Sequence, residues 1–395
     1  MTSSLYIHIP FCTSKCTYCD FFSVPADENR DSGLLDHFTG AVLDDIEDQL
    51  AYYGVDYVPS VYIGGGTPSV LTAARMESLL AGLRSLLSRM REPPVEFTVE
   101  ANPESAGKDF LEVCRSGGVG RLSLGVQTFH EPSRRAVRRS GGRGLLEERL
   151  ALAAELFPGA FSADLITGLP LQNAAALQND ITTLLSYKPA HVSLYSLTIE
   201  VQTPLGRQAA GHGAAALSLP AAEEADRLWI QGRDALEAAG LTQYEVSNFS
   251  LGGKQCVHNI RYWRMENWLG AGPAASGTLI GETGGTGRRR TYPADIAAYL
   301  AAPRPRFHSA RAEELSCGDL IRESLLMGFR FRGGPDEELF RRRFHRGIED
   351  CIPTTIARWR GRGFFAAEES IAPSQEGLLF LNRFLRDAFS ELAGN

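Results

Sequence analysis

The chain has 395 residues, 44% of them hydrophobic, and a formal net charge of −7. This length predicts one large domain with a smaller one, and the hydrophobic content is sufficient for a buried core. Without a basic excess, a nucleic-acid partner is not favoured. The N-terminal stretch MTSSLYIHIPFC lacks the pattern of a signal peptide, and no apolar run is long enough to cross a bilayer, so we expect a cytoplasmic protein.

Short apolar strands alternate with helical patterns through the first three quarters of the chain. The strands are rich in β-branched or aromatic residues and are followed by Gly, Pro or Asn. This alternation predicts parallel βαβ units, and six of them suit a partial, open barrel as well as a doubly wound sheet. The expected strands are Leu5–Pro10, Ser60–Gly64, Glu96–Glu100, Arg121–Val126, Phe161–Ile166 and His191–Leu197, and the expected helices are Leu34–Tyr53, Val70–Met90, Lys108–Ser116, Leu145–Leu156 and Ala174–Ser186.

The sequence changes character after the last of these strands. Gln208–Ala216 is rich in Gly and Ala and predicts a loop, Ala221–Ala239 predicts a helix, and Glu282–Thr291 predicts a turn or a hairpin tip. Helical patterns dominate after about Arg304, so we divide the chain into a domain over 1–300 and a small, mostly helical domain over 301–395. The helices expected in the second domain are Leu315–Phe329, Asp336–Phe344, Thr354–Arg360 and Gly377–Ser390.

Three cysteines crowd together directly after the first expected strand, in the order Cys12-Thr-Ser-Lys-Cys16-Thr-Tyr-Cys19. The other four of the seven cysteines are scattered, which is a poor disulfide framework and a good metal-ligand set. Iron–sulfur clusters usually take four cysteines, so three local thiolates leave one iron open for a substrate or cofactor. Zinc is the alternative, but its sites usually pair two short arms of Cys or His, and no second arm follows here.

The C-x3-C-x2-C spacing matches the radical S-adenosylmethionine (radical SAM) signature. The surrounding residues, Tyr6-Ile-His-Ile-Pro-Phe-Cys12 and Tyr18-Cys19-Asp20-Phe21, resemble the HemN/HemW branch of that superfamily, and the resemblance runs from about Leu5 to the C-terminus. It implies an α/β fold, a partial (β/α)6 TIM-like barrel followed by a small, mostly helical domain similar to a winged helix. It also implies a [4Fe–4S] cluster on Cys12, Cys16 and Cys19, with S-adenosylmethionine on the open iron.

Polar or Gly-rich motifs end the expected strands, where β/α barrels place their working residues. Glycines let a ligand approach the backbone closely, and Gly64-Gly65-Gly66-Thr67-Pro68 resembles the family motif that holds the methionine amino group of the cofactor. Each of these motifs also has a purely structural interpretation. The glycines would form a tight turn, the basic run at 134–139 would be a solvated face, and Tyr6 and Tyr18 would pack in the core. The other residues that the resemblance places near the cofactor are Tyr6, Tyr18, Glu100, Gln127, Arg139 and Asp164.

A second motif of the same branch lies far along the chain, at His258-Asn259-Ile260-Arg261-Tyr262-Trp263. A histidine beside Tyr and Trp is able to bind heme iron axially while the rings pack on the macrocycle. The alternative is a buried histidine that is hydrogen-bonded to the backbone. We predict His258 as a heme ligand and keep the second interpretation open.

The resemblance implies that a reduced cluster cleaves S-adenosylmethionine to methionine and a 5′-deoxyadenosyl radical, and it leaves two functions in competition. The first is a heme chaperone that hands heme to respiratory or other hemoproteins. The second is an oxygen-independent coproporphyrinogen III oxidase, which decarboxylates two propionates to vinyl groups.

Two features of the sequence favour the chaperone. The oxidases have a fourth cysteine two residues after the third, where this chain has Phe21. They also have an N-terminal extension, for which the eleven residues before Cys12 leave no room. The partners implied by the family are heme and heme-receiving proteins, together with a homodimer and transient contact with a membrane.

Overall fold

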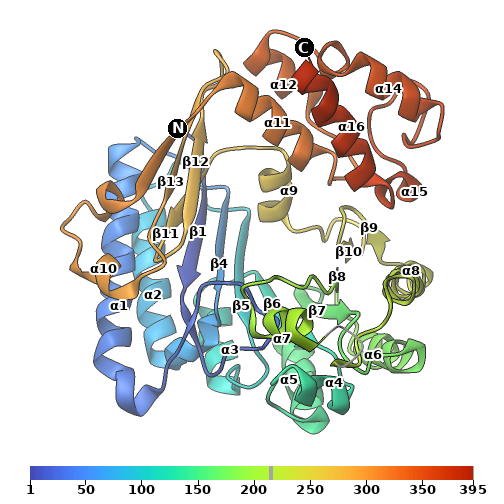
Figure 1. Cartoon of the computed structure of the whole chain (residues 1–395). Coiled ribbons are helices and arrows are strands. Elements are labelled where there is room, and N and C mark those ends of the chain that lie inside the picture. The colour runs from blue at the N-terminus through green and yellow to red at the C-terminus, as the bar shows by residue number, and fades with distance from the viewer. Residues whose placement is uncertain (213–216, 395) are drawn as a thin grey trace.

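One mixed sheet forms the centre of the computed structural model, which describes residues 1–212 and 217–394 (Figure 1). Its parallel strands follow the order β11–β1–β4–β5–β6–β7–β8, and strands that are consecutive from β1 to β8 are direct neighbours. A doubly wound sheet would reverse its strand order, so the partial, open barrel is confirmed. The bounds are β1 Ser4–Ile9, β4 Ser60–Gly65, β5 Glu96–Ala101, β6 Arg121–Gln127, β7 Phe161–Thr167, β8 His191–Ser196 and β11 Trp268–Ala271.

The core lies between these strands and the helices on their outer face. Along β1, Leu5, Ile7 and Ile9 belong to this core, whereas Tyr6 and His8 face the barrel interior, as the alternation of a strand requires. The inner face is therefore polar and the outer face apolar. The outer helices are α1 Glu28–Tyr52, α2 Thr72–Leu87, α3 Lys108–Ser116, α5 Arg143–Leu156, α6 Ala174–Ser186 and α8 Ala222–Ala238.

The predicted strands agree with the structure to within one residue at each end, and the helices α3 and α6 agree at both ends. Helix α1 begins six residues earlier than predicted, because the side chain of Asp27 accepts hydrogen bonds from the backbone N–H groups of Asn29 and Arg30. The predicted loop at Gln208–Ala216 is wrong for residues 208–212, which belong to α7 (Pro204–His212). Residues 213–216 of that prediction lie outside the described residues.

Antiparallel strands extend the sheet at both edges, and the sequence did not predict them. β9 and β10 continue from β8, while β12, β13 and β14 continue from β11. In the predicted hairpin tip Glu282–Thr291, only residues 282–286 form the turn, and the remainder is β13. The bounds are β9 Thr242–Gln243, β10 Asn248–Ser250, β12 Ser276–Ile280, β13 Gly287–Thr291 and β14 Arg311–Leu315.

Short elements complete the first part of the chain. β2 and β3 pair with each other outside the main sheet, and α9 carries His258. The bounds are β2 Phe11–Cys12, β3 Val24–Pro25, α4 Glu131–Ala136, α9 Val257–Trp263, α10 Ile296–Ala301, and the 3-10 helices η1 Pro68–Leu71 and η3 Arg306–Ser309.

A helical domain follows β14 and packs beyond the end of the sheet at which the parallel strands begin (Figure 1). Its own core centres on Phe329, Phe364 and Phe384, and the last two rings stack with centroids 4.3 Å apart. The helix predicted over Gly377–Ser390 is two helices with a break between them. The helices are α11 Cys317–Gly328, α12 Glu337–Phe344, α13 Ile348–Cys351, α14 Pro353–Arg360, α15 Gln375–Leu378 and α16 Leu381–Gly394.

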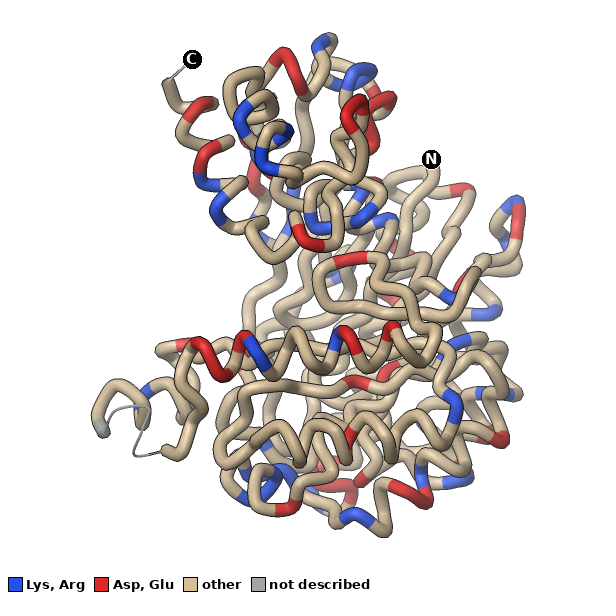
Figure 2. Tube along the Cα trace, turned by 90° about the vertical axis from the view of Figure 1, so that its right-hand side faces the viewer, with Lys and Arg blue, Asp and Glu red and all other residues tan. Residues whose placement is uncertain are grey.

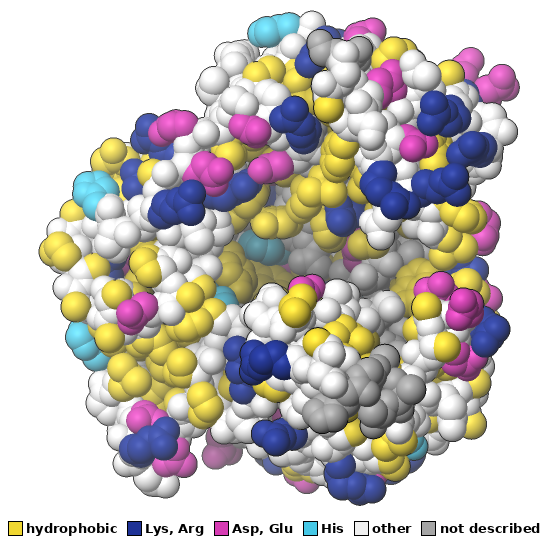
Figure 3. Space-filling view, viewed as in Figure 1, with side chains coloured by type: hydrophobic (Ala, Val, Ile, Leu, Met, Phe, Trp, Pro, Cys, Tyr) yellow, Lys and Arg dark blue, Asp and Glu magenta, His cyan; other side chains and the backbone are white. Residues whose placement is uncertain are grey.

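Two further views show where charged and hydrophobic residues lie. Along α8, which crosses the face shown in Figure 2, acidic and basic residues are interspersed. The face shown in Figure 3 is hollowed between the helical domain and the barrel, and hydrophobic side chains gather along the hollow. No helix among the residues described is long and apolar enough to span a membrane.

Asp45 on α1 links this helix to the edge of the sheet, and it predicts a pH-dependent stability. The carboxylate is fully buried and accepts hydrogen bonds from Tyr292 at 2.7 Å and from Tyr299 at 2.8 Å. Burial raises the pKa of Asp45 from 3.8 to about 6, although the two hydroxyl groups oppose the rise. The folded protein therefore holds this proton more tightly than the unfolded chain does.

A raised carboxyl pKa contributes stability below the unfolded pKa, and this contribution is lost as the pH rises through the folded pKa. Between about pH 4 and pH 7, the free energy of unfolding of the wild type should fall by roughly 2–3 kcal/mol relative to that of Asp45→Asn, which cannot titrate. Urea unfolding of both proteins at the two pH values measures this difference. A difference between the two proteins that stays constant with pH would contradict the assignment.

Candidate cofactor site

A cavity of about 320 Å³ opens at the carboxyl ends of the parallel strands. Its walls come from the cysteine loop after β1 and from the ends of β4, β5, β6, β7 and β8. In a β/α barrel, this end of the strands is where active sites are built. The predicted site residues that line it are Cys12, Cys16, Tyr18, Cys19, Gly65, Gly66, Thr67, Glu100, Gln127, Arg139 and Asp164.

The cysteine loop is held by hydrogen bonds from several parts of the chain. The N–H of Thr17 donates to the carbonyl oxygen of Val137 at 3.1 Å, and the N–H of Leu205 donates to that of Thr17 at 2.8 Å. Within the loop, the N–H of Cys19 donates to the carbonyl oxygen of Cys16 at 3.2 Å. The loop is thus fixed between the segment after α4 and the start of α7.

The three cysteines fit a cubane cluster in number, state and place. All three are free thiols, Cys12 and Cys16 are buried, and Cys19 is half-buried. No three His, Cys, Asp or Glu side chains in the described part of the chain are placed to bind one single metal ion. A cubane makes a different demand, because each thiolate binds a different iron. Phe21, at the fourth position of the motif, is 68% exposed and lines the same cavity.

Two polar side chains reach the cysteine sulfurs. The hydroxyl group of Thr67 donates to Cys12 Sγ at 3.4 Å, and Arg139 Nη1 donates to Cys16 Sγ at 3.7 Å. Donors to the sulfurs stabilise the negative charge of a thiolate-ligated cluster and tune its potential.

The glycines at the end of β4 are required by close backbone contact. A Cβ atom on Gly66 would lie 2.6 Å from the carbonyl oxygen of Phe11 and 3.1 Å from Cys12 Sγ. Gly65 has a φ angle of +111°, a conformation open mainly to glycine, and its N–H donates to Glu100 Oε2 at 3.2 Å. The backbone of this motif therefore lies directly against the cysteine loop and forms one wall of the cavity.

Two carboxylates, Glu100 on β5 and Asp164 on β7, lie inside the barrel and line part of the cavity wall. Burial raises the pKa of Glu100 to about 7 and that of Asp164 to about 6. Nearby charged side chains also contribute to both pKa shifts. A cationic ligand would favour their ionised forms. Perturbed carboxylates in a cleft are typical of functional sites.

Gln127 occupies an irregular point of the sheet. The register between β6 and β7 shifts between Gly125 and Gln127, and Gln127 has a positive φ angle of +69°. Its buried Oε1 atom has no hydrogen-bond partner among the described residues. A strained residue with an unpartnered polar atom on a cavity wall favours a ligand contact there.

Arg139 lines the cavity and lies beyond α4, which ends at Ala136. Its Nη2 atom donates to Asn102 Oδ1 at 2.8 Å, and its Nε atom lies 3.4 Å from Glu104 Oε1. The prediction of a solvated basic face is wrong for Arg134, which is 1% exposed. Arg134 is buried because it bonds to several backbone carbonyls of the turns around α4 and to Glu104.

Tyr6 and His258 lie outside the residues that line this cavity. The hydroxyl group of Tyr6 bonds with His8 Nδ1 at 2.9 Å inside the barrel. His258 is 7% exposed and lies at the opposite end of the strands, with Nδ1 3.0 Å from the hydroxyl oxygen of Ser60. The buried histidine foreseen as the alternative is what the structure shows, although the partner is a side chain and not the backbone.

Tyr62, on the inner face of β4, is a residue that the sequence analysis missed. Its hydroxyl group donates to Glu100 Oε1 at 2.6 Å, and its ring lies 5.1 Å from that of His258. Tyr62 therefore connects the carboxylate on the cavity with the motif on α9. The available signal was its position two residues before Gly64, which places both residues on the same face of the strand.

Comparison with known proteins agrees with this geometry. The radical SAM superfamily matches residues 6–184. The heme chaperone HemW of Escherichia coli is 36% identical over 285 residues, which are 70% of each chain. HemW of Bacillus subtilis is 30% identical over 400 residues, which cover 98% of this chain and all of the relative.

A solved structure extends the agreement in fold to the whole chain. It is the structure of the coproporphyrinogen III oxidase HemN from Escherichia coli, a radical SAM enzyme. The two chains superpose with a TM-score of 0.79 at 20% identity, over 98% of this chain and 89% of the other. At this identity the match supports the fold, whereas the HemW relatives decide the family. The chain therefore belongs to the radical SAM superfamily, in the family of the heme chaperone HemW.

Proposed function

We propose that this protein holds a [4Fe–4S] cluster on Cys12, Cys16 and Cys19, binds S-adenosylmethionine and heme, and delivers heme to hemoproteins. One observation carries the proposal, namely the single cavity that gathers three free cysteines with residues from the ends of five strands. The relatives are heme chaperones, and this supports heme as the cargo. Phe21, where the oxidases have a fourth cysteine, favours a chaperone over an oxidase.

The residues of the cavity suit the two halves of the cofactor site. The cysteines would bind three irons, and Thr67 and Arg139 would donate to their sulfurs. When bound, the cluster supplies the electron that reduces the sulfonium. The backbone at Gly65 and Gly66 and the carboxylate of Glu100 would bind the methionine end, whereas Asp164, Gln127 and Tyr18 line the remaining wall.

Replacing Tyr62 by Phe should weaken S-adenosylmethionine binding several-fold at neutral pH. The change removes the hydrogen bond to Glu100, and bonds to charged groups contribute about 1.5–3 kcal/mol. Because this bond lowers the pKa of Glu100, which is about 7, its loss raises that pKa further. The charged neighbour Asp164 and the hydroxyl groups of Tyr6 and Tyr62 complete the surroundings of Glu100.

Anaerobic equilibrium dialysis with radiolabelled S-adenosylmethionine from about pH 6 to pH 9 measures this effect. The pH of half-maximal affinity should move upward in Tyr62→Phe. The matched control is Tyr187→Phe, a half-buried tyrosine beyond the end of α6, which should leave the profile in place. An identical pH profile in Tyr62→Phe and wild type would show that Tyr62 does not act on the ligand through Glu100.

His258 has the chemical form that iron binding needs. Burial lowers its pKa to about 3, so the imidazole is neutral at physiological pH. The hydroxyl group of Ser60 donates to Ser4 Oγ at 2.9 Å, so His258 Nδ1 is the donor to Ser60 and Nε2 keeps its lone pair. Ligation of heme iron by His258 through Nε2 remains our prediction.

A heme titration tests the chaperone proposal. Hemin added to the anaerobically reconstituted protein should give a Soret band, and His258→Ala should weaken this band. His130→Ala is the matched control, because that histidine is near the protein surface and bonds to Ser133 Oγ. No Soret band with the wild type would overturn heme binding, and an unchanged band in His258→Ala would remove His258 as the ligand.

The same preparation tests the alternative function. Coproporphyrinogen III, S-adenosylmethionine and a reductant are added together, and the products are separated. Formation of protoporphyrinogen would make the oxidase the function and overturn the chaperone proposal. The recipient hemoproteins, a homodimer and transient membrane contact remain predictions from the family resemblance, and a cytoplasmic location remains a prediction from the sequence pattern.

A further inference from the structure

Among the three buried histidines in the described part of the chain, only His258 keeps a ring nitrogen free. The other two use both ring nitrogens, and their hydrogen bonds are those of His8 with Tyr6 and Phe22 at 2.9 Å each, and those of His191 with Ser162 at 2.7 Å and Tyr244 at 2.8 Å. The Nε2 atom of His258 has no hydrogen-bond partner among the described residues and is not fully buried. His258 therefore has a lone pair available for a ligand, whereas the other two histidines serve the fold.

A chain of hydrogen bonds determines which nitrogen of His258 is free. Arg261 Nε donates to Ser4 Oγ at 2.8 Å, and the hydroxyl group of Ser60 donates to the same oxygen at 2.9 Å. Because the proton of Ser60 is directed at Ser4, the oxygen of Ser60 accepts from His258 Nδ1 at 3.0 Å. The guanidinium group of Arg261 has no acceptor atom, and it is held in place by Glu266 at 2.7 Å. Both serines are buried, so water does not compete for these bonds.

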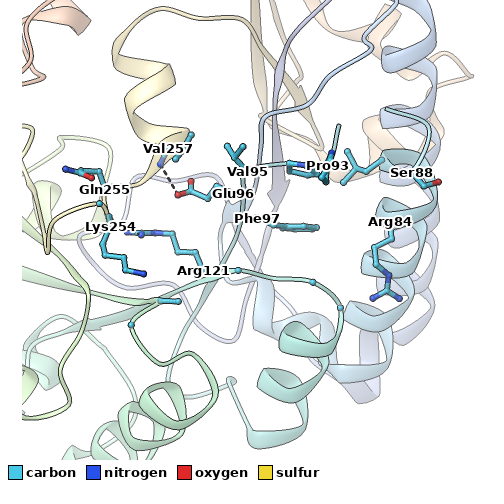
Figure 4. Close-up of a pocket in the computed structure, with 18 residues that line it drawn as sticks. Arg84, Ser88, Pro93, Val95, Glu96, Phe97, Arg121, Lys254, Gln255 and Val257 are labelled. Carbon is cyan, nitrogen blue, oxygen red and sulfur yellow. Dashed lines mark hydrogen bonds between the residues drawn. The ribbon is translucent and has the colours of Figure 1, made fainter. Parts of the chain in front are cut away.

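The backbone of His258 is held by a second set of bonds. The carboxylate of Glu96 accepts from the N–H groups of Val257 at 2.8 Å and His258 at 2.9 Å, and Figure 4 shows the first of these bonds as a dashed line. They satisfy two N–H groups in the first turn of α9, which has no side-chain cap of its own.

The groups that hold His258 share one place in the fold. Ser4, Ser60 and Glu96 are the first residues of β1, β4 and β5, which are neighbours in the sheet. The imidazole is therefore fixed against the rigid end of three strands, in both its position and its tautomer. Metal-binding histidines are typically oriented in this way, by a hydrogen bond at the nitrogen that does not bind the metal.

We propose that Ser60, supported by Ser4 and Arg261, is a positioning residue that keeps Nε2 of His258 unprotonated for the iron of heme. The inference rests on the proposed function for its ligand and adds the groups that prepare the ligating atom. Ser4 and Ser60 lie far from the motif on α9 in sequence, and only the fold brings them to it. Without the acceptor at Nδ1, the proton of the neutral imidazole would move mainly to Nε2, the nitrogen that usually carries it in water, and would block the lone pair.

The first measurement uses the full chain without heme. Nitrogen-15 NMR of the histidine-labelled protein distinguishes the two tautomers, and His258→Ala identifies the signal by removing it. The wild type should carry the proton on Nδ1, and Ser60→Ala should carry it mainly on Nε2.

The second measurement adds hemin. Ser60→Ala should lose about 10- to 100-fold in hemin affinity, which is the usual effect of removing the outer partner of a metal ligand. The midpoint potential of its bound heme should rise, because an imidazole without an acceptor at Nδ1 is a weaker donor to ferric iron. Ser60→Thr keeps the hydroxyl group and should restore both values. Ser4→Ala frees the proton of Ser60 and should change both values in the same direction as Ser60→Ala.

Ser162→Ala is the matched control, because it removes the same kind of hydroxyl group from Nδ1 of His191, whose other nitrogen is also bonded. It should leave hemin affinity and potential unchanged. If Ser60→Ala keeps the wild-type tautomer, or the wild-type affinity and potential, the positioning role is overturned while heme binding stands. If Ser60→Ala does not fold, as judged by circular dichroism, the same outcomes in Ser4→Ala decide. If the wild type binds no hemin, the proposed function fails, and the positioning role fails with it.

Discussion

Cys16→Ser is expected to abolish the iron–sulfur absorbance of the anaerobically reconstituted protein. Cys16 is one of three thiolates on the cavity, and its sulfur accepts a hydrogen bond from Arg139. A serine hydroxyl replaces the thiolate by a poor iron ligand and leaves only two corners of the cubane held by the protein. The amount of bound iron should therefore fall from about four atoms per chain to well below one.

Iron analysis and the visible spectrum measure this loss. Cys317→Ser is the matched control, because Cys317 is an exposed free cysteine at the start of α11 in the helical domain. The control should retain full absorbance, and both variants should keep the circular dichroism of the wild type. Unchanged absorbance in Cys16→Ser would remove the basis of the cofactor proposal.

Gly66→Ala is expected to reduce S-adenosylmethionine affinity at least about fivefold and to lower the yield of the cluster. The added methyl group would lie 2.6 Å from the carbonyl oxygen of Phe11 and 2.9 Å from that of Ile9. These are backbone atoms of the segment that leads into the cysteine loop, so the clash cannot be relieved by turning a side chain. Overpacking of this kind costs about 1–3 kcal/mol, which equals roughly five- to 150-fold in affinity.

Gly144→Ala provides the control for this change. Gly144 lies in α5, and a methyl group added there meets no atom within 4 Å. Its replacement should leave binding unchanged and slightly favour the helix. If Gly66→Ala bound S-adenosylmethionine as the wild type does, the backbone at the end of β4 would not be part of the ligand site.

The sequence predicted the barrel well because its signals are local. Each parallel strand is a short apolar run that ends at a polar or Gly-rich motif, and the helices between them have clear periodicity. Helix α6, for example, begins where Asn173 caps the N–H of Ala176. Where the first turn of a helix is polar, as in residues 28–33 of α1, periodicity does not mark the start and only the cap does.

The antiparallel extension could not be predicted because its signals are not local. The strand β13 reads Gly-Arg-Arg-Arg-Thr, which has no apolar alternation. It is stabilised by partners that are distant in sequence, such as Glu314 for Arg288 and Glu323 for Arg289. The helix α7 was missed for a different reason, because Gly and Ala in its second half indicate a loop.

The residues of the candidate cofactor site also fall into those with local sequence signals and those without. The cysteine loop and the glycine motif are contiguous in sequence, so both were found and lie on one cavity. Tyr62 and the buried Arg134 depend on which atoms other segments bring close, and this knowledge requires the fold. The same limit explains why Tyr6, which the family resemblance places near the cofactor, is not among the residues that line the cavity.

The hydrogen bonds that anchor Thr17 to Val137 and Leu205 do not involve iron. The apoprotein should therefore keep the arrangement of its thiols, unlike a zinc finger, which unfolds without its metal. Loss of the cluster in air would then leave a receptive scaffold that takes up iron and sulfide again once oxygen is removed. Proteases should accordingly cut the loop no faster in the iron-free form than in the loaded form.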